Sequence, residues 1–137
     1  MLSLPTGALR VSQVSLGLES TDRLFCSLVI PTYNESANIT KLIRVLSQVL
    51  DRKIPGNYEL IVVDDNSPDR TWEIAETLIP RYPHLRVLRR KGARGLSSAV
   101  VDGWQIARGE ILGVIDGDLQ HPPQILHQLL TDRKSVV

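Results

Sequence analysis

Two aspartates stand one residue apart near the end of the chain, in the stretch VIDGDLQHPP at residues 114–123. Asp116 and Asp118 follow the apolar run ILGVI and precede a pair of prolines. Because a carboxylate inside a buried strand would lose its hydration, the pair indicates that the strand ends at Ile115 and that both acids leave the sheet there. An isolated Asp-x-Asp is more often a turn or a helix cap, so other residues must decide between the two interpretations.

Other apolar runs of the sequence also end in acidic residues. The predicted strand ends carry five carboxylates, those of Glu35, Asp64, Asp65, Asp116 and Asp118. Gathered at one edge they would repel one another, and a divalent metal with an anionic ligand would relieve the repulsion. Oxygen ligands of this kind suit Mg²⁺ or Mn²⁺ shared with a phosphate. A basic run at residues 89–94 would face the same phosphates.

Each feature also has a purely structural interpretation. Asp64 and Asp65 are suited to cap a following helix, and the basic run can be a solvated loop. Tyr33 can simply pack, and Trp72 and Trp104 lie on helical patterns typical of core or groove residues. The functional interpretation gains weight because all the polar signals fall at the same edge of one predicted sheet.

The elements that would position these residues alternate regularly from residue 25 on. Short apolar runs predict strands that are buried on both faces, and apolar residues at helical spacing predict the segments between them to be helices. The predicted strands are 25–31, 58–64, 85–90 and 110–116, and the predicted helices span about 39–50 and 71–81, run from Ser97 or Ser98 to Ala107, and begin again at Pro122.

This alternation predicts an α/β fold, a Rossmann-like parallel sheet of about four strands with flanking helices. Ligands of such sheets bind outside the carboxyl ends of the strands, where the polar residues stand.

Composition narrows the function classes. The chain has 137 residues, 42% of them hydrophobic, and a net charge of +1, which gives no reason to propose nucleic acid as a partner. The single cysteine, Cys26, lies in an apolar run and is expected to be a buried filler, so a cytoplasmic setting fits best. No apolar run reaches the ~20 residues of a membrane span. Residues 1–24 are expected to be a poorly ordered leader.

Four stretches, PTYNE, VVDDNSPDRT, KGARGLSSAVVDGWQIARGE and VIDGDLQHPP, resemble in order and spacing the nucleotide-sugar half of family 2 glycosyltransferases. The branch that they resemble most is the polyprenol-phosphate (dolichol-phosphate) mannosyltransferases. The resemblance covers roughly residues 26–131. It implies a GT-A fold, a GDP- or UDP-sugar donor, a divalent metal and transfer with inversion to a polyprenol phosphate or a saccharide.

The resemblance also implies roles for individual residues. Asp116, Asp118 and Gln120 match positions that face the metal, and Asp116 and Asp118 also face the donor diphosphate. Arg94 matches a basic position near a phosphate, so Asp118 and Arg94 would be the catalytic positions. The positions expected to bind the nucleotide sugar are Pro31, Tyr33, Glu35, Asp64, Asp65 and Asp116.

Two features depart from the family pattern. The chain reads SPDRT where many relatives have glycine in place of Arg70. Members also continue for about a further hundred residues with acceptor-binding groups, whereas this chain ends in the irregular tail 133–137, so residues 25–132 are expected to be the donor part of a truncated GT-A domain. If a membrane acceptor is right, the chain would attach only peripherally.

Three other functions stay open on the sequence alone. The chain could be a non-catalytic remnant that at most binds nucleotide and metal. A dehydrogenase is disfavoured because the turn PTYNE lacks a Gly-x-Gly-x-x-Gly. A phosphotransferase would normally carry its Asp-x-Asp after the first strand.

Overall fold

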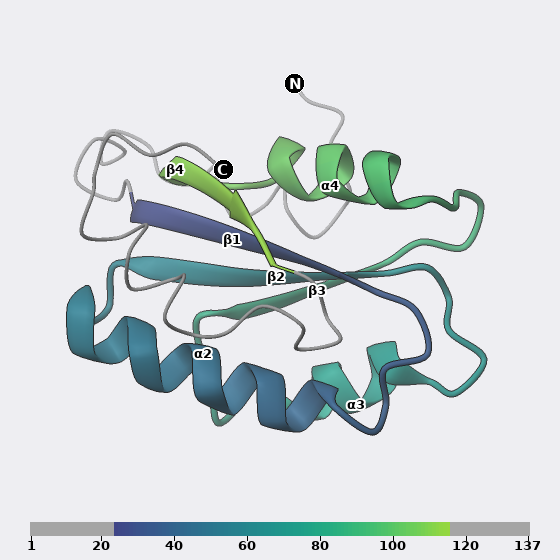
Figure 1. The fold of residues 1–137 in the computed structure, drawn as a ribbon, viewed down its shortest axis with the longest axis horizontal. Helices are drawn as coiled ribbons and strands as arrows, with labels where there is room; N and C mark the ends of the chain where they lie inside the picture. The colour runs from purple at the N-terminus through teal and green to yellow at the C-terminus, as the bar shows by residue number, and fades with distance from the viewer. Residues whose placement is uncertain (1–23, 116–137) are drawn as a thin grey trace.

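The computed structural model describes residues 24–115 (Figure 1). Several predictions fall outside these residues and stay predictions: the leader over residues 1–23, the helix from Pro122, the tail 133–137, and the positions of Asp116, Asp118 and Gln120. Leu24, predicted to end the leader, is instead the first residue of a strand.

Within residues 24–115, four parallel strands form one sheet in the order β3-β2-β1-β4. The strands are β1 (Leu24–Thr32), β2 (Tyr58–Asp64), β3 (Leu85–Arg89) and β4 (Gly109–Val114). The two central strands are the most apolar, and every residue of β2 is buried. Because β2 and β3 lie on one side of β1 and β4 on the other, the strand order reverses at β1, the place where such sheets bind ligands.

In the part of the chain that the structure describes, three helices cover the two faces of the sheet. Helices α2 (Ile39–Lys53) and α3 (Thr71–Leu78) lie on one face, and α4 (Leu96–Gln105) lies on the other (Figure 1). This arrangement confirms the predicted α/β fold of about four parallel strands. The helix ends differ by a few residues from the prediction. At the start of α4, Gly95 has a φ of +116°, and the helix begins directly after it.

Alternate residues of the central strands supply two separate cores. Cys26, Leu28 and Ile30 of β1 point toward α2 and α3, whereas Val29 packs with Ala99 of α4. The predicted role of Cys26 is confirmed: its side chain is 3% exposed. Burial, with a smaller contribution from a nearby carboxylate, raises the pKa of its thiol to about 11, so the group stays protonated and unreactive at neutral pH.

A buried carboxylate joins the strands at the end of the sheet where β2 begins. Glu59 is 1% exposed and accepts hydrogen bonds from Ser27 Oγ at 2.6 Å, Arg86 Nη1 at 2.8 Å and the backbone N–H of Arg108 at 2.7 Å. Burial alone would raise the pKa of Glu59, but these hydrogen bonds outweigh it and hold the pKa below its ordinary value. Glu59 therefore links β1, β2, β3 and the turn before β4.

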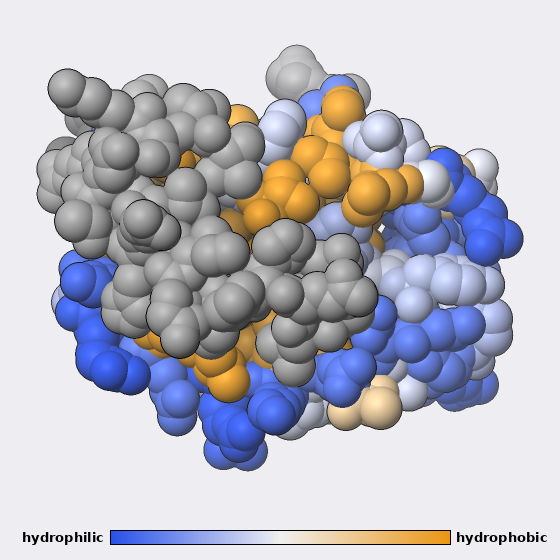
Figure 2. Space-filling view, viewed as in Figure 1, coloured by the Kyte–Doolittle hydropathy of each residue, from blue (hydrophilic) through white to orange (hydrophobic). Residues whose placement is uncertain are grey.

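The hydropathy of the surface differs between α2 and α4. The outward face of α2 is hydrophilic, while apolar surface gathers over α4, where Leu96 and Val101 are exposed (Figure 2). Within residues 24–115, no helix combines the length and the apolar character that crossing a membrane requires.

Candidate functional site

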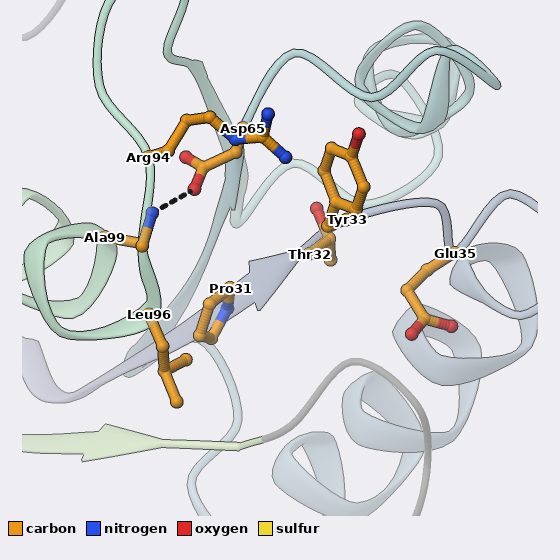
Figure 3. Close-up of a pocket in the computed structure, with 9 residues that line it drawn as sticks. Pro31, Thr32, Tyr33, Glu35, Asp65, Arg94, Leu96 and Ala99 are labelled. Atoms are coloured by element: carbon orange, nitrogen blue, oxygen red, sulfur yellow. Dashed lines mark hydrogen bonds between the residues drawn. The ribbon is translucent and has the colours of Figure 1, made fainter.

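A pocket of about 310 Å³ opens at the carboxyl ends of β1 and β2 (Figure 3). The β1–α2 turn forms one wall, and the loop before α4 with the first turn of that helix forms the other. The lining residues are Pro31, Thr32, Tyr33, Glu35, Asp65, Arg94, Gly95, Leu96 and Ala99. The structure describes six of the positions predicted to bind the nucleotide sugar or to be catalytic. Asp64 does not line this pocket, and the other five do: Pro31, Tyr33, Glu35, Asp65 and Arg94.

An aromatic ring and a guanidinium meet inside this pocket. The Cζ atom of Arg94 lies 4.9 Å from the centroid of the Tyr33 ring, and Figure 3 shows the two side chains approaching from opposite walls. Tyr33 is 41% exposed, so its ring is available to a ligand on the surface rather than packed in the core. The site thus holds a flat apolar face and a positive charge side by side.

The Asp65 carboxylate is held on the pocket wall by a second arginine and a backbone amide. Arg90 donates through Nε to Oδ1 at 2.6 Å and through Nη2 to Oδ2 at 3.0 Å. The N–H of Gly95 donates to Oδ2 at 3.0 Å, the bond drawn as a dashed line in Figure 3. The hydrogen bond to Asp65 raises the pKa of Arg90 despite the opposing effect of burial, so the guanidinium of Arg90 is charged throughout the physiological range.

Asp64, the neighbouring carboxylate, is placed quite differently. Its side chain is fully buried and accepts hydrogen bonds from Thr32 Oγ1 at 2.6 Å and from the Oγ and N–H of Ser67 at 2.7 and 2.9 Å. The two acids differ because successive strand residues point to opposite faces. Asp64 is not among the residues that line the pocket, so its predicted part in nucleotide-sugar binding stays a prediction, while its hydrogen bonds give it a structural role at the end of β2.

The β2–α3 loop and the first residue of α3 support the β1–α2 turn through further hydrogen bonds. The backbone N–H of Asn34 donates to Ser67 Oγ at 2.8 Å, and that of Glu35 donates to Thr71 Oγ1 at 2.9 Å. The N–H of Ser36 donates to an oxygen of Asp69 at 3.1 Å. The sequence stretch DDNSPDRT therefore holds PTYNE in place, and only Asp65 of that stretch faces the pocket.

The basic run at residues 89–94 does not face the pocket as a unit, which corrects that prediction. Arg89 lies with its Cζ atom 3.6 Å from the Trp72 ring centroid and donates to Asn66, while Arg90 is buried against carboxylates. Among the cations of this run, Arg94 alone lines the pocket. The sequence missed this division because alternation along β3 and its end, not composition, decides where each arginine points.

The predicted repulsion among carboxylates is relieved locally for the described residues. Hydroxyl and amide donors satisfy Asp64, and Arg90 pairs with Asp65. Within residues 24–115, no cluster of three or more His, Cys, Asp or Glu residues is arranged to hold a metal ion. The described chain ends at Ile115, whose N–H donates to the Val29 carbonyl at 3.0 Å beside the pocket edge. The predicted metal ligands follow in sequence and lie outside the described residues.

Sequence reasoning missed four lining residues and the buried arginine behind them. Thr32, Gly95, Leu96 and Ala99 line the pocket, and Arg90 supports it without lining it. The Gly-Leu-Ser-Ser stretch after a basic run was the available signal, since a glycine before a helix lets the chain pass close to a ligand.

Fold and site together define a class: α/β proteins that take a ligand at the carboxyl edge of a parallel sheet, where its order reverses. Residues 27–132 match the family model for glycosyl transferase family 2, and the chain belongs to this family.

Curated relatives carry the same resemblance over part of their length. The chain is 48% identical over 105 residues to dolichol-phosphate mannosyltransferase of Pyrococcus furiosus, which covers 76% of this chain and 28% of the relative. It is 39% identical over 103 residues to dolichol-phosphate mannosyltransferase of Saccharomyces cerevisiae, covering 75% of this chain and 39% of the relative. The chain thus spans less than half the length of these relatives.

Solved structures share the fold. S. aureus TarS in complex with UDP is 31% identical and superposes with a TM-score of 0.57 over 69% of this chain and 28% of its own. Glucosyl-3-phosphoglycerate synthase of M. tuberculosis is 28% identical with a TM-score of 0.63 over 85% and 43%. Mannosyltransferase PcManGT of Pyrobaculum calidifontis, solved with GDP-Man and Mn²⁺, is 22% identical with a TM-score of 0.62 over 80% and 32%, a likeness of fold.

Proposed function

We propose that this chain forms the donor-binding half of a glycosyltransferase that moves a sugar, mannose or another hexose, from a nucleotide diphosphate to a polyprenol or dolichyl phosphate or to a saccharide, with inversion. The single observation that carries the proposal is the pocket that places Tyr33, Asp65 and Arg94 together. The identity of 48% to a dolichol-phosphate mannosyltransferase supports the mannosyl donor and the lipid-phosphate acceptor.

Each of the three side chains suits one part of a nucleotide diphosphate. The Tyr33 ring offers a flat face on which a base stacks. Asp65 accepts a hydrogen bond from a base N–H, which both guanine and uracil carry next to a carbonyl group. The Arg94 guanidinium donates to phosphate oxygens and stabilises the charge that develops on the departing diphosphate. UDP in TarS and GDP-Man in PcManGT support this class of donor.

A divalent metal belongs to the proposal through residues beyond the described part. Asp116, Asp118 and Gln120 would hold it, since carboxylate and amide oxygens suit Mg²⁺ and Mn²⁺. When bound, the metal supplies a Lewis acid at the diphosphate. The Mn²⁺ in PcManGT supports a divalent ion without deciding which one. A lipid-phosphate acceptor, met peripherally at a membrane surface, is already anionic and needs no strong general base.

The second candidate is a chain that binds nucleotide and metal without turnover. The observation that favours it is that this chain covers 28% of the length of the P. furiosus relative.

Calorimetric titration with GDP and UDP, each with Mn²⁺ or Mg²⁺, tests the donor site. We expect saturable binding that depends on the metal, and we expect Asp118→Ala to remove the metal dependence. A folded sample that binds neither nucleotide would contradict donor binding. A radiolabelled transfer assay on dolichyl phosphate then separates the two candidates, because sugar transfer by this chain would exclude the second.

A further inference from the structure

Arg90 is a buried arginine behind the pocket wall, and each of its guanidinium donors bonds to a residue around the site. Arg90 follows β3, is 6% exposed and does not itself line the pocket. A buried arginine is stable only where its charge and its donors are matched, so its partners define its role.

All five N–H groups of this guanidinium find an acceptor. Nε and Nη2 bind the two oxygens of Asp65 at 2.6 and 3.0 Å. Nη1 donates to Ser98 Oγ at 3.0 Å and to Asp102 Oδ2 at 2.9 Å, and Nη2 also donates to the Gly95 carbonyl at 3.1 Å. One side chain therefore ties the acid on the pocket wall to the loop and helix that form the opposite wall.

The backbone of Arg90 fixes the position of this hub. Its N–H donates to the Asp64 carbonyl at 2.8 Å, so it continues the β3–β2 ladder by one residue. Gly95 closes the arrangement, because its carbonyl accepts from Arg90 while its N–H donates to Asp65 at 3.0 Å. Arg94, the residue before Gly95, is thereby held at the pocket.

The hydrogen bonds from Arg90 and Gly95 also set the direction from which the Asp65 carboxylate can accept a further hydrogen bond. Two carboxylate oxygens offer about four acceptor positions, and Arg90 and Gly95 use three of them. The remaining position suits a single N–H from the ligand. A carboxylate free to rotate would offer no such fixed direction.

We infer that Arg90 is a positioning residue of the donor site: it orients the Asp65 carboxylate toward the nucleobase and holds the loop that carries Arg94. The inference rests on the proposed function. It predicts that the fork shape of the guanidinium matters and not its charge alone, because lysine presents three donors from one point and cannot join both oxygens of Asp65 with Gly95, Ser98 and Asp102.

The test compares Arg90→Lys with Arg89→Lys, a matched change one residue earlier in the chain. Arg89 contacts Trp72 and Asn66 and does not line the pocket. Affinity for GDP and UDP with Mn²⁺ is measured by calorimetry, far-UV circular dichroism checks folding, and hydrogen exchange is followed at the Gly95 amide. We expect Arg90→Lys to weaken the nucleotide that the wild type binds by at least about tenfold and to speed exchange at Gly95, whereas Arg89→Lys changes both by less than about twofold.

Asp102→Asn covers the case in which Arg90→Lys fails to fold. Asp102 is 39% exposed and lies outside the pocket, yet it anchors Nη1 of Arg90. Its neutralisation should weaken nucleotide binding by about threefold while the fold persists.

The outcomes separate the two claims. If the wild-type protein binds no nucleotide, the proposed function fails and the positioning role fails with it. If the wild type binds and folded Arg90→Lys, or Asp102→Asn in its place, binds equally well, the positioning role alone is overturned.

Discussion

The Cζ atom of Arg94 lies 4.9 Å from the centroid of the Tyr33 ring, so a cation covers the aromatic face that a nucleobase would use. A base that stacks on this face of the ring would displace the guanidinium. A diphosphate on the same ligand compensates by offering Arg94 a new partner, whereas a nucleoside offers none. The contact should therefore favour phosphorylated ligands over free nucleosides.

Arg94→Ala should change the two affinities in opposite directions. We expect a nucleoside to bind about threefold more tightly, because the cation–π contact no longer competes. The corresponding diphosphate should bind about tenfold more weakly, because a charged hydrogen bond is lost. Calorimetry with guanosine, uridine and their diphosphates measures both.

Lys91→Ala serves as the control, since Lys91 is an exposed cation of the same loop that does not line the pocket. At physiological salt it should alter either affinity by less than about twofold. If Arg94→Ala lowered the affinity for a nucleoside, Arg94 would not compete with the base for the Tyr33 ring.

Asp64→Asn tests whether this buried acid is structural. Thr32 and Ser67 aim three donors at its two oxygens, so an amide nitrogen would face a donor instead of accepting one. We expect a loss of about 2–4 kcal/mol in the free energy of unfolding, measured by urea denaturation. Glu73→Gln, which removes an exposed ion pair with Arg70, should cost less than about 1 kcal/mol. Equal stability of the two variants would contradict the structural role of Asp64.

Alanine substitutions at three glycines should lower stability to different degrees, because the added methyl group meets different surroundings at each. At Gly109 it would lie 2.6 Å from backbone atoms of Cys26 and Ser27, and at Gly103 it would lie 2.7 Å from a Val29 methyl group. Gly109→Ala should therefore destabilise the fold most, and Gly103→Ala by about 1–3 kcal/mol, because a side chain yields more easily than backbone.

Gly92→Ala is the control for this series, since nothing lies within 4 Å of its added methyl group. Thermal unfolding of the three variants should give the order Gly109, Gly103, Gly92 from most to least damaging. Any other order would mean that α4 or β4 packs on β1 differently from the structure.

The buried Glu59 makes stability depend on acid pH. Its pKa in the folded chain lies below the ordinary value of 4.5, so its stabilisation is fully present above that value and is lost as the pH falls through the lower folded pKa. Glu59→Gln should cost about 3–5 kcal/mol at pH 7, because Arg86 and Arg108 lose their charged partner.

The loss of unfolding free energy caused by Glu59→Gln should become smaller as the pH falls below 4.5, the ordinary pKa of a glutamate. At such pH the wild-type Glu59 becomes protonated and loses its charge too. Urea unfolding at several pH values follows the difference, with the exposed Glu110→Gln as the control. A deficit that does not change with pH would remove Glu59 as the origin of the acid sensitivity.

The sequence predicted the sheet, the helices and most of the pocket, because apolar periodicity and the carboxyl-edge rule both act through the backbone. The sequence alone could not show that Asp64 and Asp65 have different surroundings, because the strand register decides to which side each of two adjacent acids points. It also could not assign the arginines at residues 89–94, because burial and partners, not composition, decide which one meets a ligand.

Arg70 shows a departure from the family pattern that the structure explains. It adopts a φ of +63° at the start of α3, a left-handed conformation that glycine adopts without strain. The glycine of many relatives at this position suits that backbone. At this position the chain holds a larger residue in a backbone conformation that favours glycine.

Hydrogen-exchange mass spectrometry of the chain with and without GDP or UDP and Mn²⁺ tests the central claim most directly, because it asks whether the nucleotide occupies this pocket. The account predicts slower exchange in residues 31–35, 64–66 and 91–99, the segments that line the cavity or hold its walls. It predicts no change in the amides around Glu59, at the opposite end of β2. Saturable binding without protection of the three segments, or protection confined to other parts of the chain, would contradict it.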